Sequence, residues 1–167
     1  MYDIHCILTP RIGFGSNPKH YKDETAYSKA ITRFLIANKF VAHLLRAGTG
    51  RYKIFMIWTM RSALEYSPTQ RSGMEDPEVY VPAAAACVMI AGEKLRSFED
   101  EWVPGELTGR PALGGPLWEG KQGFCEGRWM LWKERFGAVA KEEAISEEVK
   151  RVAKEACEEM VRLDKDM

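Results

Sequence analysis

The sequence lacks the features that mark several common classes of protein. Lysine and arginine together number 24, and aspartate and glutamate also number 24, so no net charge attracts the chain to nucleic acid or an acidic membrane. The four cysteines are widely spaced and form no Cys-x-x-Cys pair, which favours free thiols over a disulfide framework. Histidine, cysteine and carboxylate side chains do not cluster at ligand spacing, so we expect no metal site.

Long apolar runs and nucleotide-binding motifs are also missing. The longest uncharged stretch in a predicted helix, residues 79–92, is too short and too rich in alanine to span a bilayer. The first eight residues lack the basic start of a signal peptide, and Pro10 ends their apolar stretch. No Gly-x-x-x-x-Gly-Lys-Ser/Thr or Gly-x-Gly-x-x-Gly motif is present. We therefore expect a cytoplasmic protein without a membrane segment, a nucleic-acid partner, a metal or a cofactor.

The composition that remains is typical of one globular domain. Of the 167 residues, 46% are hydrophobic and 29% are charged. Residues 1–23 show no sustained periodicity and contain several prolines and glycines, so they are predicted to form an irregular N-terminal segment. Residues 24–167 are predicted to form a helical domain.

Five segments have the apolar spacing of helices, which predicts an all-α single domain with an irregular bundle of about five helices. They cover about residues 23–47, 50–66, 77 or 82 to 98, 124–141 and 147–164. The second contains five consecutive apolar residues, Ile54–Trp58, and a strand is the alternative there. Its continuation to Glu65 favours a helix that is apolar on most sides and therefore surrounded by protein.

A long segment between the third and fourth helices, residues 99–123, is rich in proline and glycine. It contains three prolines and six glycines, which exclude a long helix. Its apolar side chains, among them Trp102, Leu113 and Trp118, gain from burial, so we expect the loop to pack over one end of the domain. Such a loop is suited to act as a lid.

Three residues are candidates for catalysis. Arg61 and Glu65 stand four residues apart on the most apolar helix and are expected to share a face and pair. They are either a structural ion pair or a cavity pair, in which Arg61 holds an oxygen-rich ligand and Glu65 is a general base. His43 lies on the flank of the first helix, either as an acid–base group or as an ordinary packing residue.

The large side chains of the predicted helices and loop are candidates for ligand binding, since tryptophan and methionine line cavities as well as cores. The candidates are Met56, Trp58, Trp102, Trp118, Arg128, Trp129 and Trp132. Basic residues alternate with Trp129 and Trp132, a pattern also found in nucleic-acid binding, but the neighbouring Glu126 and Glu134 reduce any attraction for phosphate.

Two separated motifs resemble one known family. They are Ile57–Glu65 with Val81–Ala85 and Ala91-Gly92, and then Gly123–Phe136 followed by a terminal helix rich in alanine and glutamate. The sequence is similar over these motifs to a fungal helical family known only as a domain of unknown function, number 3632. The similarity extends from about Thr32 to the C-terminus and leaves residues 1–23 unmatched. It implies a fungal intracellular helical domain and no particular chemistry.

Two functions follow from these observations as hypotheses. The first is binding of a small, largely apolar or aromatic molecule, extending to a cofactor-independent cyclase or isomerase of fungal metabolism. The alternative is a protein-interaction or homodimerisation module without catalysis. It is suggested by the last helix, whose narrow apolar stripe is suited to pack on a partner or on its own core.

Overall fold

The computed structural model describes residues 23–71, 75–100 and 112–166, apart from the side chain of Arg51. Within these ranges the chain forms five α-helices and one short 3₁₀ turn, and no strand. The elements are α2 (Glu24–Arg46), η3 (Gly50–Tyr52), α3 (Lys53–Leu64), α4 (Pro77–Ser97), α5 (Glu126–Val139) and α6 (Glu147–Lys165). The predicted all-α class and each predicted helix are confirmed. The predicted irregular segment lies outside the described residues, except for Asp23.

The helices begin and end at residues that satisfy their free backbone groups. Asp23 accepts a hydrogen bond from the backbone N–H of Ala26 at 2.7 Å, and Asp76 accepts one from Glu78 at 2.9 Å. The Ser146 hydroxyl, at the N-cap of α6, accepts one from Val149 at 3.4 Å. Gly48 has a φ of 91° just after α2, a conformation that glycine adopts without strain.

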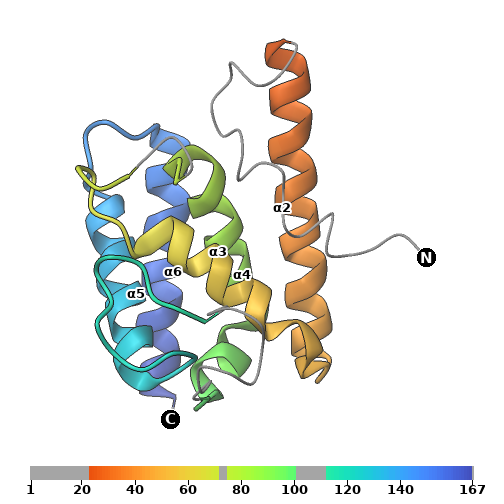
Figure 1. Cartoon of the computed structure of the whole chain (residues 1–167), viewed down its shortest axis with the longest axis vertical. Coiled ribbons are helices and arrows are strands. Elements are labelled where there is room, and N and C mark those ends of the chain that lie inside the picture. Colours follow the sequence, from red (N-terminus) through yellow and green to blue (C-terminus); the bar gives the residue numbers. More distant parts are fainter. Residues whose placement is uncertain (1–22, 72–74, 101–111, 167) are drawn as a thin grey trace.

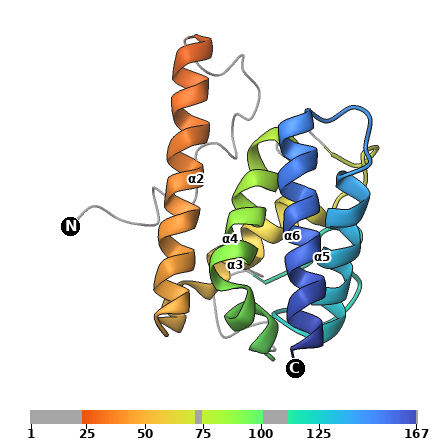
Figure 2. The same ribbon diagram turned by 180° about the vertical axis from the view of Figure 1, so that it is seen from behind.

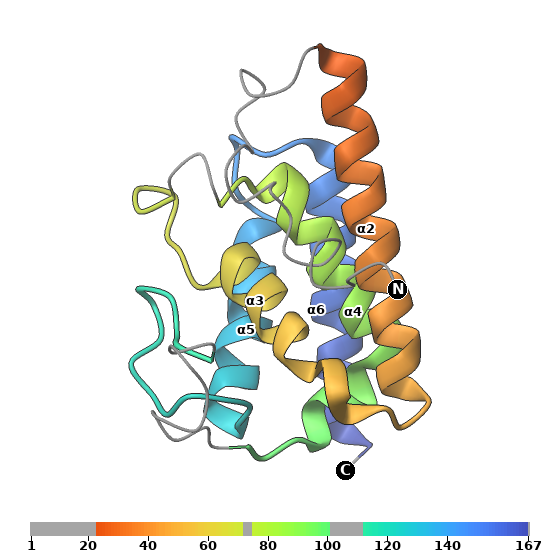
Figure 3. The same cartoon turned by 45° about the vertical axis from the view of Figure 1, so that its right-hand side comes forward.

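Helix α4 is the centre of the bundle. It packs against α2, α3 and α6, and α5 covers the outer side of α6. Figures 1 and 2 show α2 running along one side of the molecule, with its first turns extending past the ends of the other helices. Figure 3 shows the segment after residue 112 on the same side as α3 and α5.

Helix α3 is buried on most sides, as its run of apolar residues predicts. Seven of its twelve residues are buried: Phe55, Met56, Ile57, Thr59, Met60, Ala63 and Leu64. One of these buried residues, Thr59, is polar. Its hydroxyl donates to Asn38 Oδ1 of α2 at 2.6 Å. Asn38 in turn donates to the carbonyl of Phe34 at 2.9 Å, so this buried pair has hydrogen-bond partners.

The apolar stripe of α6 faces the domain's own core. Its buried residues are Val149, Ala153, Ala156, Met160 and Leu163. The helix packs against α4 and α5, which leaves the charged face outward. Of the two uses that the sequence left open for this stripe, the structure shows packing on the chain's own core.

Three helices are joined by one carboxylate near the end of the chain. Asp164 of α6 accepts hydrogen bonds from Arg96 Nε of α4 at 3.1 Å and from Trp129 Nε1 of α5 at 2.9 Å. Lys133 Nζ of α5 also donates to it. Burial raises the pKa of the Asp164 carboxyl, but the hydrogen bonds from Lys133, Trp129 and Arg96 outweigh it and hold the pKa below its ordinary value.

This cluster predicts a pH-dependent contribution to stability. The folded pKa of Asp164 lies below its ordinary value of 3.8, so the unfolded chain takes up the proton first as the pH falls. The contribution is complete above the ordinary value and is lost as the pH drops through the folded pKa. We expect Asp164→Asn to reduce the free energy of unfolding by roughly 1–3 kcal/mol at pH 7.

Urea unfolding of the protein and of Asp164→Asn between pH 7 and pH 3 checks this expectation. The difference between the two proteins should shrink as the pH falls below about 4. A difference that stays constant across this range contradicts the assignment.

Candidate functional site

Glu65 is the centre of a buried polar cluster. Its side chain is 0% exposed, and each of its two carboxylate oxygens accepts two hydrogen bonds. Arg128 Nε and Trp132 Nε1 each donate to Oε1 at 2.7 Å. Arg128 Nη2 donates to Oε2 at 3.1 Å, and the backbone N–H of Gly115 donates to the same oxygen at 2.7 Å.

Arg128 links this cluster to the segment that precedes α5. Its Nη1 donates to the carbonyls of Ala112 and Gly123, both at 3.0 Å. Its guanidinium carbon lies 5.5 Å from the ring centre of Trp132 and 5.8 Å from that of Trp118. The side chain is completely buried, so its charge is compensated by Glu65 and by these carbonyls.

The segment before α5 comes close to the end of α3 at Gly115. A Cβ atom at this position would lie 2.7 Å from both Cβ and O of Glu65. The carbonyl of Glu65 also accepts a hydrogen bond from Leu117 at 3.1 Å. Glycine is therefore required here for the loop to reach the end of α3.

The predicted pairing of Arg61 with Glu65 is wrong, because the partner of Glu65 is Arg128. Glu65 is the residue that follows the last turn of α3, and its N–H still donates to the carbonyl of Arg61 at 2.9 Å, but donors from α5 and from the segment before it take both of its carboxylate oxygens. Arg61 instead donates to the carbonyl of Leu113 at 3.2 Å, and its buried Nε has no hydrogen-bond partner. Both residues hold the loop, and neither faces a described pocket.

The geometry of the cluster is that of a structural ion pair. A general base needs a free lone pair directed at a substrate. The oxygens of Glu65 instead face four protein donors, and the carboxylate is not exposed. The cluster therefore fits the other alternative that the sequence left open, a structural ion pair that anchors the core. The cation of this pair is Arg128 and not Arg61.

Most of the predicted ligand-binding side chains are in the core. Met56, Trp129 and Trp132 are buried, and Trp58 is half-buried with its ring 5.1 Å from that of Phe55. Trp118 is half-buried and donates to the carbonyl of Lys121 at 3.0 Å. Trp102 lies outside the described residues.

The loop that was expected to bury its apolar side chains does so only in part. Ala112 is buried, but Leu113 is 41% exposed, contrary to the expectation that it packs inward. The physical reason is that this segment is held by backbone groups: the carbonyl of Leu113 accepts from Arg61, and those of Ala112 and Gly123 accept from Arg128.

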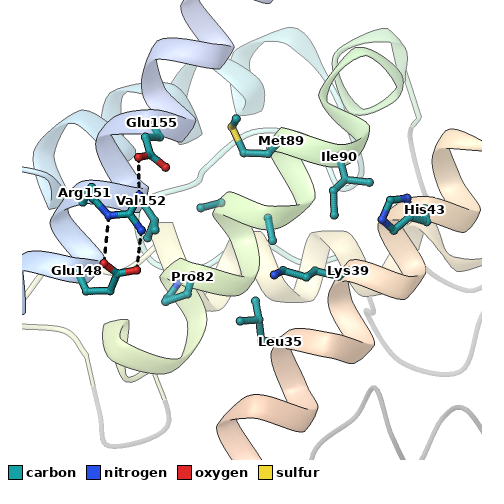
Figure 4. A pocket seen from close by; sticks show the side chains of 12 residues that line it. Leu35, Lys39, His43, Pro82, Met89, Ile90, Glu148, Arg151, Val152 and Glu155 are labelled. Atoms are coloured by element: carbon teal, nitrogen blue, oxygen red, sulfur yellow. Dashed lines mark hydrogen bonds and ion pairs between the residues drawn. The ribbon is translucent and has the colours of Figure 1, made fainter.

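His43 lies at a different place, a surface groove between α2, α4 and α6 (Figure 4). The groove encloses about 540 Å³. Its floor is the outward face of α4, where residues are small or apolar, and its walls are α2 and α6. The lining residues are Leu35, Lys39, His43, Pro82, Ala85, Ala86, Met89, Ile90, Glu148, Arg151, Val152 and Glu155.

The two walls of the groove differ in charge. On α6, Arg151 donates to Glu148 at 2.6 and 3.1 Å and to Glu155 at 2.5 Å, so this wall has one more carboxylate than it has cations. These hydrogen bonds lower the pKa of Glu148 and raise that of Arg151, which keeps both groups charged. On α2, Lys39 and His43 have no ion-pair partner among the described residues.

The described part of the chain gives little support for a metal site, a cysteine nucleophile or a membrane-spanning helix. No group of three histidine, cysteine or acidic side chains there is placed to hold a metal ion. Burial raises the pKa of the Cys87 thiol to about 12, which makes it a poor nucleophile. None of the helices that the structure describes has both the length and the apolar character needed to cross a bilayer.

Sequence reasoning did not find the partner of Glu65 or the groove. One signal for the partner of Glu65 was present in the sequence. Arg128 stands four residues before Trp132 and eight before Phe136, within the apolar stripe of α5. A cation in such a stripe indicates a buried counter-charge. The groove depends on how far apart α2 and α6 lie on α4, and no local pattern contains this spacing.

The cluster predicts very different costs for the two arginines. Arg128→Met leaves the Glu65 carboxylate buried without its counter-charge, so we expect the free energy of unfolding to fall by about 3–5 kcal/mol. Arg61→Met removes one hydrogen bond to a carbonyl and should cost about 1 kcal/mol. Urea unfolding followed by tryptophan fluorescence measures both values. Equal losses in the two variants contradict the pairing.

Comparison with known proteins places the chain in a family. A family model described as "Protein of unknown function (DUF3632)" matches residues 9–136, more than half of the chain. The match starts earlier than the expected Thr32 and ends within α5, so it includes part of the segment before α2 and excludes α6. No curated protein and no solved structure matches the chain. The chain therefore belongs to the DUF3632 family of proteins of unknown function.

Proposed function

We propose that this chain is a helical protein-interaction module, and that the groove between α2, α4 and α6 binds an amphipathic helix. The observation that carries the proposal is the apolar floor of the groove, where Met89 is 52% exposed between two charged walls. An apolar floor with a charged rim is the arrangement that helix-in-groove recognition uses.

The residues of the floor favour a helix as the occupant. Pro82, Ala85 and Ala86 are small enough for a second backbone to approach α4 closely. Packed helices lie about 8–10 Å apart, and small side chains at the contact favour the shorter distances. Met89 adds a flexible side chain that adapts its shape to a partner. An occupant helix would therefore touch α4 with its apolar stripe and the two walls with its flanks.

The walls then set the orientation of the occupant. The ammonium group of Lys39 on α2 favours acidic residues on one flank of the helix, and Glu148 and Glu155 on α6 favour basic residues on the other. Exposed ion pairs add little affinity, so the apolar contacts provide most of the binding energy. The charges act mainly by selecting the partner.

Binding of a small apolar or aromatic molecule is the second candidate, with the same groove as its site. His43 supports it, because it is the one sequence-predicted acid–base residue that lines a described pocket. A cofactor-independent cyclase or isomerase would then depend on His43 rather than on the enclosed Glu65. The fungal origin and the cytoplasmic location inferred from the sequence stay predictions.

Photo-crosslinking in a fungal host tests what occupies the groove. We expect p-benzoylphenylalanine in place of Met89 to form a covalent adduct with a protein, since the residue lies on the exposed floor of the groove. The matched control carries the same group in place of Met130 of α5, which is 46% exposed outside the groove. Mass spectrometry identifies the adduct and the attached peptide.

The result separates the two candidates. A protein adduct at Met89 that is absent at Met130, and that maps to an amphipathic helix, supports the interaction module. Absence of any adduct specific to Met89, together with a reproducible added small mass in native mass spectrometry, contradicts it and favours the small-molecule candidate.

A further inference from the structure

The outward face of α2 carries two large apolar side chains without cover. Ile36 is 60% exposed and Phe40 is 55% exposed, the highest values among the large hydrophobic residues that the structure describes. They stand four residues apart and therefore share one face of the helix. Contact of such a pair with water is unfavourable, so a covered state is favoured.

This apolar pair lies next to the groove, on the helix that forms one of its walls. Lys39 and His43 of α2 line the groove, and Ile36 and Phe40 are their neighbours further around the same helix. A projecting apolar pair and an apolar groove thus adjoin on one side of the molecule. Figures 2 and 4 show α2 at the edge of the bundle, with α4 between it and α6.

We propose that the occupant of the groove is α2 of a second copy of this chain, in a twofold-symmetric dimer. Ile36 and Phe40 of each copy would contact the groove floor of the other at Ala86 and Met89. This inference rests on the proposed function of the groove and names its partner. The groove is incomplete in the single chain, because the partner copy supplies the apolar side chains that cover its floor.

The charges of α2 and of the α6 wall of the groove favour this occupant. Helix α2 carries Lys29, Arg33, Lys39 and Arg46 against one acidic residue, Glu24. Lys29 and Arg33 lie on the same face as the apolar pair, by their spacing along the helix, and have no ion-pair partner among the described residues. The far wall of the groove offers the exposed carboxylates of Glu148 and Glu155.

The cation on the near wall sets the position of the incoming helix. Lys39 repels a basic helix, whereas the carboxylates of α6 attract it, so the incoming α2 is expected to lie against α6. Because the apolar pair and the groove lie side by side, a twofold axis satisfies both contacts at once. The assembly then closes at two copies and does not extend into a filament.

The test uses three variants of the full chain, each with one residue changed. Phe40→Glu alters the projecting pair, and Ala86→Lys alters the groove floor. Met130→Glu is the matched control, an exposed apolar residue of α5 changed in the same way as Phe40. Circular dichroism and thermal unfolding check that all three fold as the parent chain does.

Sedimentation velocity over a range of concentrations measures the association of each protein. We expect the parent chain and Met130→Glu to dimerise, and Phe40→Glu and Ala86→Lys each to self-associate at least about tenfold more weakly. An equimolar mixture of Phe40→Glu and Ala86→Lys should associate more tightly than either variant alone, because the introduced carboxylate of one copy then meets the introduced ammonium group of the other. Rescue on mixing requires that the two positions touch between copies.

Two outcomes overturn the proposal. One is a parent chain that stays monomeric at every concentration. The other is a dimer that Met130→Glu disrupts and Phe40→Glu does not. After either result, crosslinking at Met89 tests the groove separately. An adduct to a different protein retains the interaction module and rejects only the second copy as its partner. The absence of an adduct rejects both the dimer and the interaction module.

Discussion

The ion pair between Glu65 and Arg128 holds the polar interior of this domain together. It joins the end of α3 to the beginning of α5 and, through the carbonyls of Ala112 and Gly123, to the segment between α4 and α5. A buried charge is tolerated only when its partner and its hydrogen bonds are all in place. These contacts are mutually dependent, because Gly115 must approach α3 for the carboxylate to be satisfied and Arg128 must be enclosed for its charge to be compensated.

This dependence limits where function can reside. The acid that the sequence marks for catalysis already has four donors, and two of the tryptophans that it marks for ligand binding, Trp129 and Trp132, are buried and donate to structural carboxylates. Their chemistry stabilises the fold. The apolar stripe of α6 is also used internally. Among the described residues, the surface of the bundle is left for recognition, including the groove where α2 and α6 stand on either side of α4.

The helices were predictable because their signals are local. Spacing of apolar residues, the caps at Asp23 and Ser146, and the glycine after α2 depend only on neighbours in the chain. The partner of Glu65 was not predictable in this way, because Arg128 is 63 residues away and the i, i+4 rule pointed to Arg61. That rule considers only neighbours on one helix, whereas the Glu65 carboxylate takes its donors from α5 and from the segment before it. The groove depends on the spacing of three helices, which no local pattern specifies.

The pattern of α2 shows two apolar surfaces on one helix. One face, with Phe34, Val41 and Leu45, packs on the core, and Ile36 and Phe40 lie outside that stripe. A helix with a single partner needs one apolar stripe and a polar opposite face. A second apolar pair costs solubility unless something covers it. Pairing α2 with the groove of another copy would bury both faces of the helix and the floor of α4 together, so one contact accounts for two exposed apolar features that the fold of a single chain leaves unexplained.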